Sequence, residues 1–168
     1  PLLRALADPT LPEDACDRER LVHWCLRANE THLIDPFPPF ATLAELGRWV
    51  ERHPGSGLDI SDRFLADLVT WYHLAWLGES VRRSDARVKR LMEKGRGFTV
   101  HDRRELLVVI GELLQGVIPR YRALAEAGQV ELSVTPYAHP ILPLLQDLTS
   151  VTEAWPDAPL PTAHAYPG

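Results

Sequence analysis

The sequence predicts a mostly helical chain with one or few β-strands, which forms part of an α/β domain. Apolar residues recur at helical spacing over most of the first 127 positions. By contrast, residues 129–134 alternate between polar and apolar side chains, as a short strand does. The 168 residues are 45% apolar and 24% charged, which is typical of a folded domain and excludes a disordered chain.

Two helices are predicted in the first third of the chain. The first spans about 13–30, where acidic residues at its start suit the positive end of the helix dipole. The prolines within 36–39 cannot continue this helix, because each of them lacks a backbone N–H donor. A shorter helix follows over about 42–52, and the turn residues of 53–57 end it.

Three further helices are predicted before the strand. A helix over 61–77, with its first serine as the N-cap, is apolar on nearly every side, which predicts that it is buried. A helix over 84–94 is likewise expected to start at a serine cap. The longest helix is expected over 100–127, where Thr99 caps its start and Gly128 ends it.

A single strand, 129–134, follows the longest helix directly. Because the edges of a strand carry unpaired N–H and C=O groups, one strand cannot form a sheet by itself. A long helix that runs into a strand is typical of a βαβ unit, so the other strands of a parallel sheet are expected outside this segment. We expect one segment, 1–168, with a helical lead-in (1–58), helices (59–127), a strand, active-site loop and short helix (128–148), and an irregular tail (149–168).

Charge, hydropathy and cysteine spacing exclude several classes of partner. The chain has 18 basic and 23 acidic side chains, a formal net charge of −5, so we expect no nucleic-acid partner. No apolar run approaches the ~20 residues of a membrane span, so we expect no membrane partner. Cys16 and Cys25 would lie roughly 13 Å apart along one helix axis, too far for a disulfide. Free thiols indicate a reducing compartment, and we expect a cytoplasmic location.

Metal and cofactor motifs are absent from the sequence. The seven histidines are scattered, and none has the i, i+4 partner or the cysteine and acid spacing of a zinc site. The chain has no phosphate-binding glycine loop and no nucleophile elbow. We therefore expect no metal and no cofactor. The five tryptophans either line a saccharide groove or pack in the core, and the four on predicted helices are expected in the core.

The loop after the predicted strand holds the candidate binding residues. In α/β domains the functional groups gather in the loops that leave the C-terminal ends of strands. Here that loop presents Thr135, Tyr137 and His139 between two prolines that stiffen the backbone, as a sugar site requires. From the residues alone, a structural role for His139 stays open. Glu131 is either a solvated edge residue or a carboxylate that points into a barrel.

The run from Gly128 to Leu145, GQVELSVTPYAHPILPLL, resembles the second sequence signature of glycoside hydrolase family 57. Residues 71–76 (WYHLAW) and 93–99 (EKGRGFT) resemble the helical segments that precede this signature in the amylase-like branch. Residues 165–168 (AYPG) fit the family as well. The resemblance covers roughly 59–168.

This resemblance implies a helical slice of a seven-stranded (β/α) barrel that acts on α-glucans by a retaining mechanism. Retention uses two carboxyl groups about 5–5.5 Å apart. The family supplies them as a Glu nucleophile and an Asp acid/base on strands after this signature, so we expect no catalytic residue within the chain. His139 would hydrogen-bond a glucosyl hydroxyl, and Glu131 would face the barrel interior. Tyr137 and Thr135 are further substrate-binding candidates.

Two classes of function stay open at this point. The first is an internal fragment of an α-amylase-like or glucanotransferase-like enzyme, inactive alone. The second is a non-catalytic helical module that binds saccharide or a protein partner and derives from the same barrel. A deacetylase of the related barrel superfamily would need an Asp/His/His metal set that the segment lacks. We also expect self-association, because the strand edges and the apolar faces of the 61–77 and 106–118 helices would be exposed unless another copy covers them.

Overall fold

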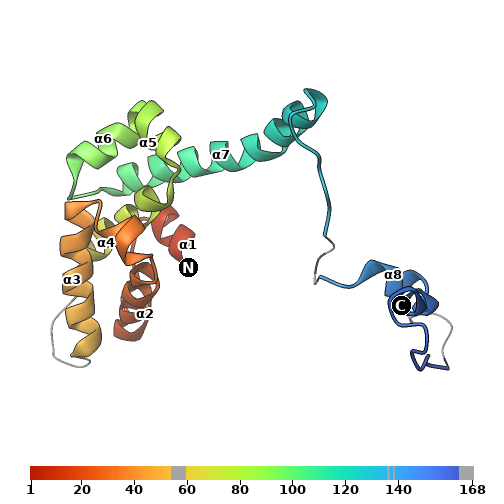
Figure 1. Cartoon of the computed structure of the whole chain (residues 1–168). Helices are drawn as coiled ribbons and strands as arrows, with labels where there is room; N and C mark the ends of the chain where they lie inside the picture. The colour runs from red at the N-terminus through yellow and green to blue at the C-terminus, as the bar shows by residue number, and fades with distance from the viewer. Residues whose placement is uncertain (54–59, 136, 138, 163–168) are drawn as a thin grey trace. The chain divides into compact units, whose positions relative to one another are not determined.

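The computed structural model describes residues 1–53, 60–135, 137 and 139–162 and divides the chain into two units, Pro1–Pro119 and Arg120–Gly168 (Figure 1). The first unit contains α1 (Leu2–Ala7), α2 (Ala15–Leu26), a π-helical turn (Glu30–Ile34), α3 (Pro38–Arg52), α4 (Asp62–Trp76), α5 (Glu79–Ser84), α6 (Ala86–Lys94) and most of α7 (Val100–Glu126). The second contains the end of α7, α8 (Leu142–Gln146), a 3₁₀ turn (Leu148–Ser150) and α9 (Val151–Ala154).

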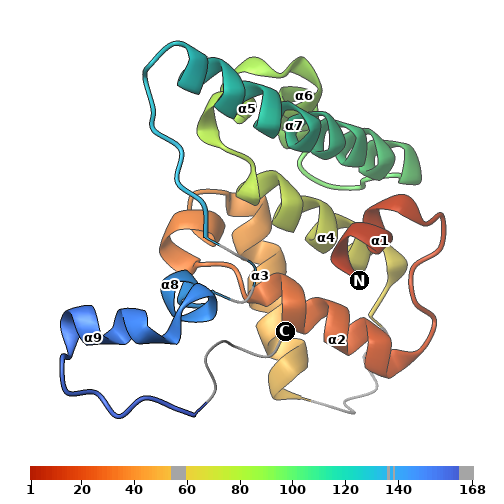
Figure 2. The ribbon, with the colours of Figure 1, turned by 90° about the vertical axis from the view of Figure 1, so that its right-hand side faces the viewer.

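Helix α4 lies at the centre of the first unit. It packs against α1, α2 and α3 (Figure 2), and most of its residues are buried, including Leu68 and Trp71. The prediction of a buried helix over 61–77 is therefore confirmed. The expectation that the apolar face of this helix stays exposed is wrong, because the chain's own N-terminal helices cover it. Of the four helical tryptophans predicted in the core, Trp71 is buried and Trp24 packs partly buried against the core. Trp49 is half-buried and stacks on His53, whereas Trp76 is more than half exposed.

Side-chain caps define where two of these helices begin. The hydroxyl of Ser61 accepts a hydrogen bond from the backbone N–H of Phe64 at 3.2 Å, as its sequence position predicts. At the next predicted start, the serine at position 84 ends α5 instead. Asp85 caps α6, because its carboxylate accepts bonds from the backbone N–H groups of Arg87 and Val88 at 2.8 and 3.3 Å. The predicted helix over 84–94 is thus one cap residue too early.

Helix α7 begins and ends as the sequence predicts. Thr99 Oγ1 accepts from the N–H of Asp102, and the Asp102 carboxylate accepts from the Thr99 N–H at 2.7 Å, which is a capping box. At the other end, Gly128 has φ +66°. The N–H of Gln129 then bonds back to the carbonyl of Leu124, so the last carbonyls of the helix are satisfied.

The predicted strand over 129–134 does not form. The described part of the chain contains no β-strand, and residues 130–135 have no regular secondary structure. Alternating polarity can make a segment extended, but a strand also needs a second strand for its ladder of hydrogen bonds. Among the described residues no segment supplies that partner, so Val134 and its neighbours stay exposed.

The second unit consists of short helical turns. The predicted helix over 141–148 appears as α8, and the 3₁₀ turn that follows is capped by Asp147, whose carboxylate accepts from the Thr149 N–H at 2.8 Å. Helix α9 lies in the part of the tail predicted to be irregular, so that prediction is wrong at 151–154. The stretch 165–168, quoted above for its resemblance, lies outside the described residues.

The described residues lack two features. None of their helices has the length and apolar character that a membrane crossing would require. They also contain no group of three or more His, Cys, Asp or Glu side chains placed to hold a metal ion. Both cysteines are free thiols; Cys16 is exposed and Cys25 is buried.

Candidate functional site

The four predicted binding residues lie in the segment that follows α7. Glu131, Thr135, Tyr137 and His139 are all exposed, and the Tyr137 side chain is fully so, at 101%. None of them makes a side-chain hydrogen bond to another described residue. They therefore present a carboxylate, a hydroxyl, a phenol and an imidazole to solvent without a described cavity around them.

His139 has an unusual backbone. Its φ is +57°, and among the described residues it is the non-glycine residue with positive φ. Only a few per cent of non-glycine residues adopt this left-handed region, with Asn, Asp and His the most frequent among them, and it costs about 1–3 kcal/mol. Such strain is concentrated at binding and catalytic sites. The sequence contained no signal for this conformation. The structure does not test contact between these four residues and a saccharide, which stays a prediction.

A buried carboxylate that the sequence analysis missed organises the loop between α6 and α7. Asp67 on α4 accepts hydrogen bonds from the backbone N–H groups of Gly97 at 2.9 Å and Phe98 at 2.8 Å. It is buried in the core beside apolar residues of the same helix. A carboxylate within the apolar pattern of 61–77 was the available signal, since a charge is rarely buried there without partners.

Further contacts fix the same loop from the α4 side. The indole N–H of Trp71 donates to the carbonyl of Gly95 at 2.6 Å. Gly95 and Gly97 have φ of +72° and +74°, which other residues adopt only with strain. The N–H groups of residues 95–98 thus all have hydrogen-bond partners and glycine supplies the turns, so α7 starts from a fixed point.

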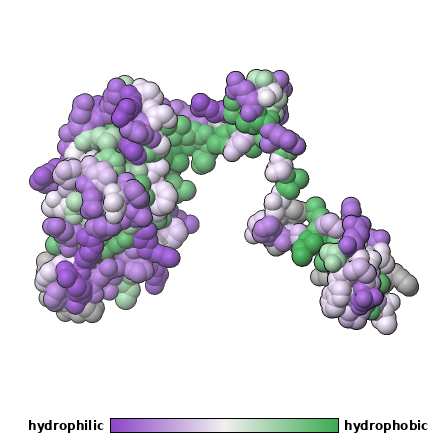
Figure 3. All heavy atoms as spheres, in the orientation of Figure 1, coloured by the Kyte–Doolittle hydropathy of each residue, from purple (hydrophilic) through white to green (hydrophobic). Residues whose placement is uncertain are grey.

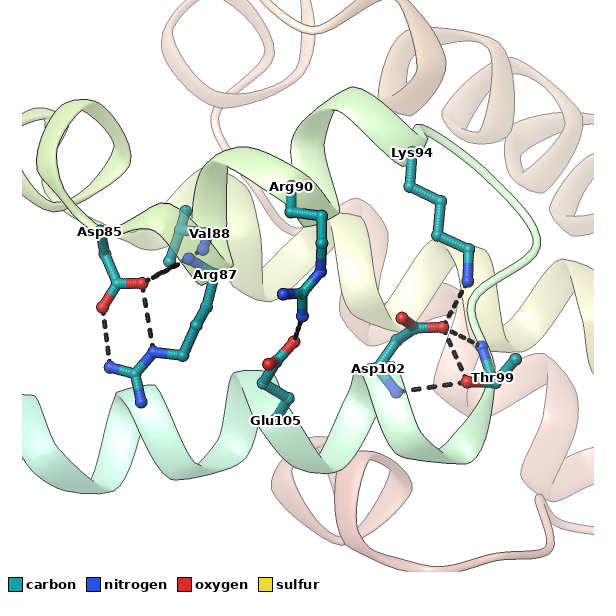
Figure 4. A network of polar contacts seen from close by, with 8 residues as sticks. All are labelled: Asp85, Arg87, Val88, Arg90, Lys94, Thr99, Asp102 and Glu105. Carbon is teal, nitrogen blue, oxygen red and sulfur yellow. Dashed lines mark hydrogen bonds and ion pairs between the residues drawn. The ribbon is translucent and has the colours of Figure 1, made fainter.

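A row of ion pairs joins α6 to α7 along their length. Figure 4 shows Lys94 pointing to Asp102 and Arg90 pointing to Glu105 across the two helices. At the start of α6, Arg87 pairs with Asp85, the cap residue of the same helix. The Lys94 Nζ and Asp102 Oδ2 atoms lie 2.5 Å apart. The basic partners are partly or largely exposed, whereas Asp102 is buried. Because water still screens each pair from its basic side, each contributes only about 1 kcal/mol. Their regular spacing fixes the register of the two helices and carries no chemistry of its own.

Two buried titratable groups are held in their neutral forms. Burial raises the pKa of the Cys25 thiol well above its usual range. Burial also lowers the pKa of His73, although the hydrogen bond between its Nδ1 and the Val69 carbonyl, 2.8 Å long, opposes that shift. Since a carbonyl only accepts, Nδ1 carries the proton. Neither group lines one of the four pockets described in the first unit.

The outer face of α7 is apolar and exposed. Figure 3 shows hydrophobic surface along this helix, and its exposed apolar side chains in the first unit are Val108, Leu113, Leu114, Val117 and Ile118. The expectation for the 106–118 helix is therefore confirmed for its second half, and it is wrong for Leu106 and Val109, which are buried. The self-association predicted from it stays a prediction.

The sequence of this chain matches a known protein family. The sequence model of Glycosyl hydrolase family 57 matches residues 37–156, well over half of the 168-residue chain, which places the chain among the glycoside hydrolases. The chain belongs to Glycosyl hydrolase family 57. The resemblance inferred from the 128–145 run is thus confirmed, and the match includes all four candidate binding residues. Neither the curated proteins nor the solved structures contain a match to the chain.

Proposed function

We propose that this chain is the saccharide-contacting portion of a glycoside hydrolase or transglycosidase that acts on α-glucans with retention of configuration. The observation that carries the proposal is the family match over 37–156, which spans the exposed loop with Tyr137 and His139. The family membership supports carbohydrate as the substrate class. The (β/α) barrel around the loop is part of the proposal.

The loop residues have chemistry suited to a sugar. The imidazole of His139 can hydrogen-bond a glucosyl hydroxyl, and the Thr135 hydroxyl can donate to or accept from one. The phenol of Tyr137 offers an apolar face to a pyranose ring and a polar tip to its hydroxyls. Glu131 can accept hydrogen bonds from two hydroxyls at once. The positive φ of His139 supports a role for this loop in which side-chain direction matters.

The chemical step would need two carboxyl groups about 5–5.5 Å apart, one as nucleophile and one as acid/base. We assign neither role to a residue of positions 1–168. The nucleophile Glu and the acid/base Asp are proposed to lie outside this chain, and the chain alone is expected to bind saccharide without hydrolysing it.

Binding is tested by titrating maltoheptaose into the chain and following the backbone amides of 129–145 by NMR. We expect the His139→Ala variant to bind about tenfold more weakly, the loss typical of one hydrogen bond of about 1.4 kcal/mol. His101→Ala is the matched control, since His101 is an exposed histidine on α7. Equal affinity of His139→Ala and wild type would remove His139 from the site, and no binding at all would count against the loop.

Catalysis is tested with the polypeptide encoded by the whole reading frame. Activity on amylose and maltooligosaccharides, with a Glu and an Asp beyond the 128–145 run required for it, would support the enzyme. A stop codon after Gly168, or an inert full-length product that still binds maltoheptaose, would favour the non-catalytic saccharide-binding module instead.

A further inference from the structure

A pocket in the first unit has positive side chains without a described function. It has a volume of about 330 Å³ and lies where the loop after α1, the start of α4 and the 97–103 segment meet. Arg63 and Arg103 line it, together with Asp62 and Gly97. Its volume is at the low end of the range for small-molecule sites, which is about 300–1,000 Å³.

Arg103 is a buried cation without a close counter-ion. It is 4% exposed. Its two terminal nitrogens donate to the backbone carbonyls of Ala5 and Pro9, the latter at 3.3 Å, whereas its Nε has no partner in the described structure. No described carboxylate lies within ion-pair distance of it. A buried guanidinium usually requires an anionic partner, because removing a charge from water costs several kcal/mol.

The surrounding charges do not neutralise this group at close range. Burial lowers the pKa of Arg103 and the charge of Arg104 lowers it further, while the carboxylates of Asp62 and Asp8 oppose the shift from a distance. Asp62 is already paired with Arg18. The pocket therefore has a basic character although the chain as a whole is acidic.

Arg63 supplies a second guanidinium at the same pocket. It is exposed at the start of α4 and makes no ion pair with a described residue. A Cβ atom built on Gly97 would lie 3.6 Å from its Nη2, so this guanidinium lies beside the glycine. Arg63 also lines a neighbouring pocket of about 310 Å³, together with Arg96.

We propose that the pocket lined by Arg63 and Arg103 binds a small oxyanion, a phosphate or carboxylate group, free or carried on a compact metabolite. The planar fork of the Arg63 guanidinium can donate two parallel hydrogen bonds to such a group, and charge assistance makes these bonds about twice as strong as neutral ones. A bound anion would give Arg103 the counter-ion it lacks. This site is distinct from the 131–139 loop and does not depend on the proposed saccharide function.

The experiment measures binding of inorganic phosphate and, in a separate titration, acetate by calorimetry, with chloride used to hold ionic strength constant. The variant is Arg63→Met, which changes an exposed side chain and so leaves the fold intact. Arg83→Met is the matched control, because it removes one exposed arginine of α5 that does not line the pocket. We expect at least one of the two anions to bind wild type and the Arg83→Met control with equal affinity. The same anion should bind Arg63→Met about tenfold more weakly.

Thermal unfolding supplies a second measurement on the same three proteins. An anion that binds only the folded chain stabilises it by RT ln(1 + [L]/Kd) and so raises the melting temperature, and at one anion concentration the rise should be smaller in Arg63→Met alone. Preference for phosphate over acetate would identify a phosphoryl group, and the reverse a carboxylate. If neither anion binds wild type, or if Arg63→Met binds both as wild type does, the site does not exist and Arg103 only ties α7 to the backbone at Ala5 and Pro9.

Discussion

Replacing Asp67 by asparagine should destabilise the first unit strongly for a change of one atom. The Asp67 carboxylate accepts two backbone hydrogen bonds, from Gly97 and Phe98, in a buried position. Hydrogen bonds to a charged group contribute about 1.5–3 kcal/mol each. Asparagine keeps one acceptor without the charge and turns an N–H donor towards one of the two backbone N–H groups, which is left unsatisfied. We expect a loss of about 3 kcal/mol in the free energy of unfolding.

Urea denaturation followed by circular dichroism measures this loss, and amide hydrogen exchange at Gly97 and Phe98 locates it. Asp35→Asn is the control, since Asp35 is exposed and its side chain makes no hydrogen bond to a described residue. The control should change the unfolding free energy by less than about 0.5 kcal/mol. A loss of under 1 kcal/mol in Asp67→Asn, with unchanged protection of both amides, would refute the assignment of Asp67 as the anchor of the 95–98 loop.

Asp85, two glycines of the α7 region and the two cysteines allow three further predictions. The guanidinium that bonds to Asp85 lowers the pKa of its carboxyl to about 2, so the stability that Asp85 contributes is present above about pH 4 and is lost as the pH falls towards 2; acid titration of wild type against Asp85→Asn measures it. Gly128→Ala should destabilise the end of α7 by about 1 kcal/mol because of the positive φ. Gly111→Ala, in open space on the same helix, should instead stabilise the helix by a similar amount. Amide hydrogen exchange of α7 should therefore become faster in the first variant and slower in the second, and a change of the same sign in both would contradict this reasoning. In the native protein, a thiol reagent should modify Cys16 quickly and Cys25 only on unfolding, and equal rates would contradict the burial of Cys25.

The ends of the helices were predictable where side chains close in sequence determine them. Ser61 and the Thr99–Asp102 pair cap helices by bonds that span three residues, and Gly128 ends one through its own backbone, so the sequence carried each signal. The strand over 129–134 was not predictable from its alternation, because pairing depends on a partner distant in sequence. The predicted start of α6 was one residue too early, because Ser84 and Asp85 are adjacent and both residue types are good helix caps.

The functional residues divide in the same way, into those marked by local sequence and those whose roles depend on contacts distant in sequence. The loop with Tyr137 and His139 was predicted as a binding site from its residue types and its resemblance to a family, and that role stays a prediction. Asp67 and Arg103 were missed, because their roles arise from backbone groups 30 and nearly 100 positions away. A charged residue inside an apolar helical pattern marks such positions, but it does not indicate which partner will satisfy it.

The fixed start of α7 also determines how accurately the helix is aimed. From Val100 to Pro119 the helix rises about 1.5 Å per residue and is roughly 30 Å long, so a tilt of about 5° at its base would move its far end by roughly 2.6 Å. The hydrogen bonds of Asp67 lie at that base. A substitution that loosens them therefore lowers the angular precision of α7 as far as Pro119, even where the helix itself stays intact.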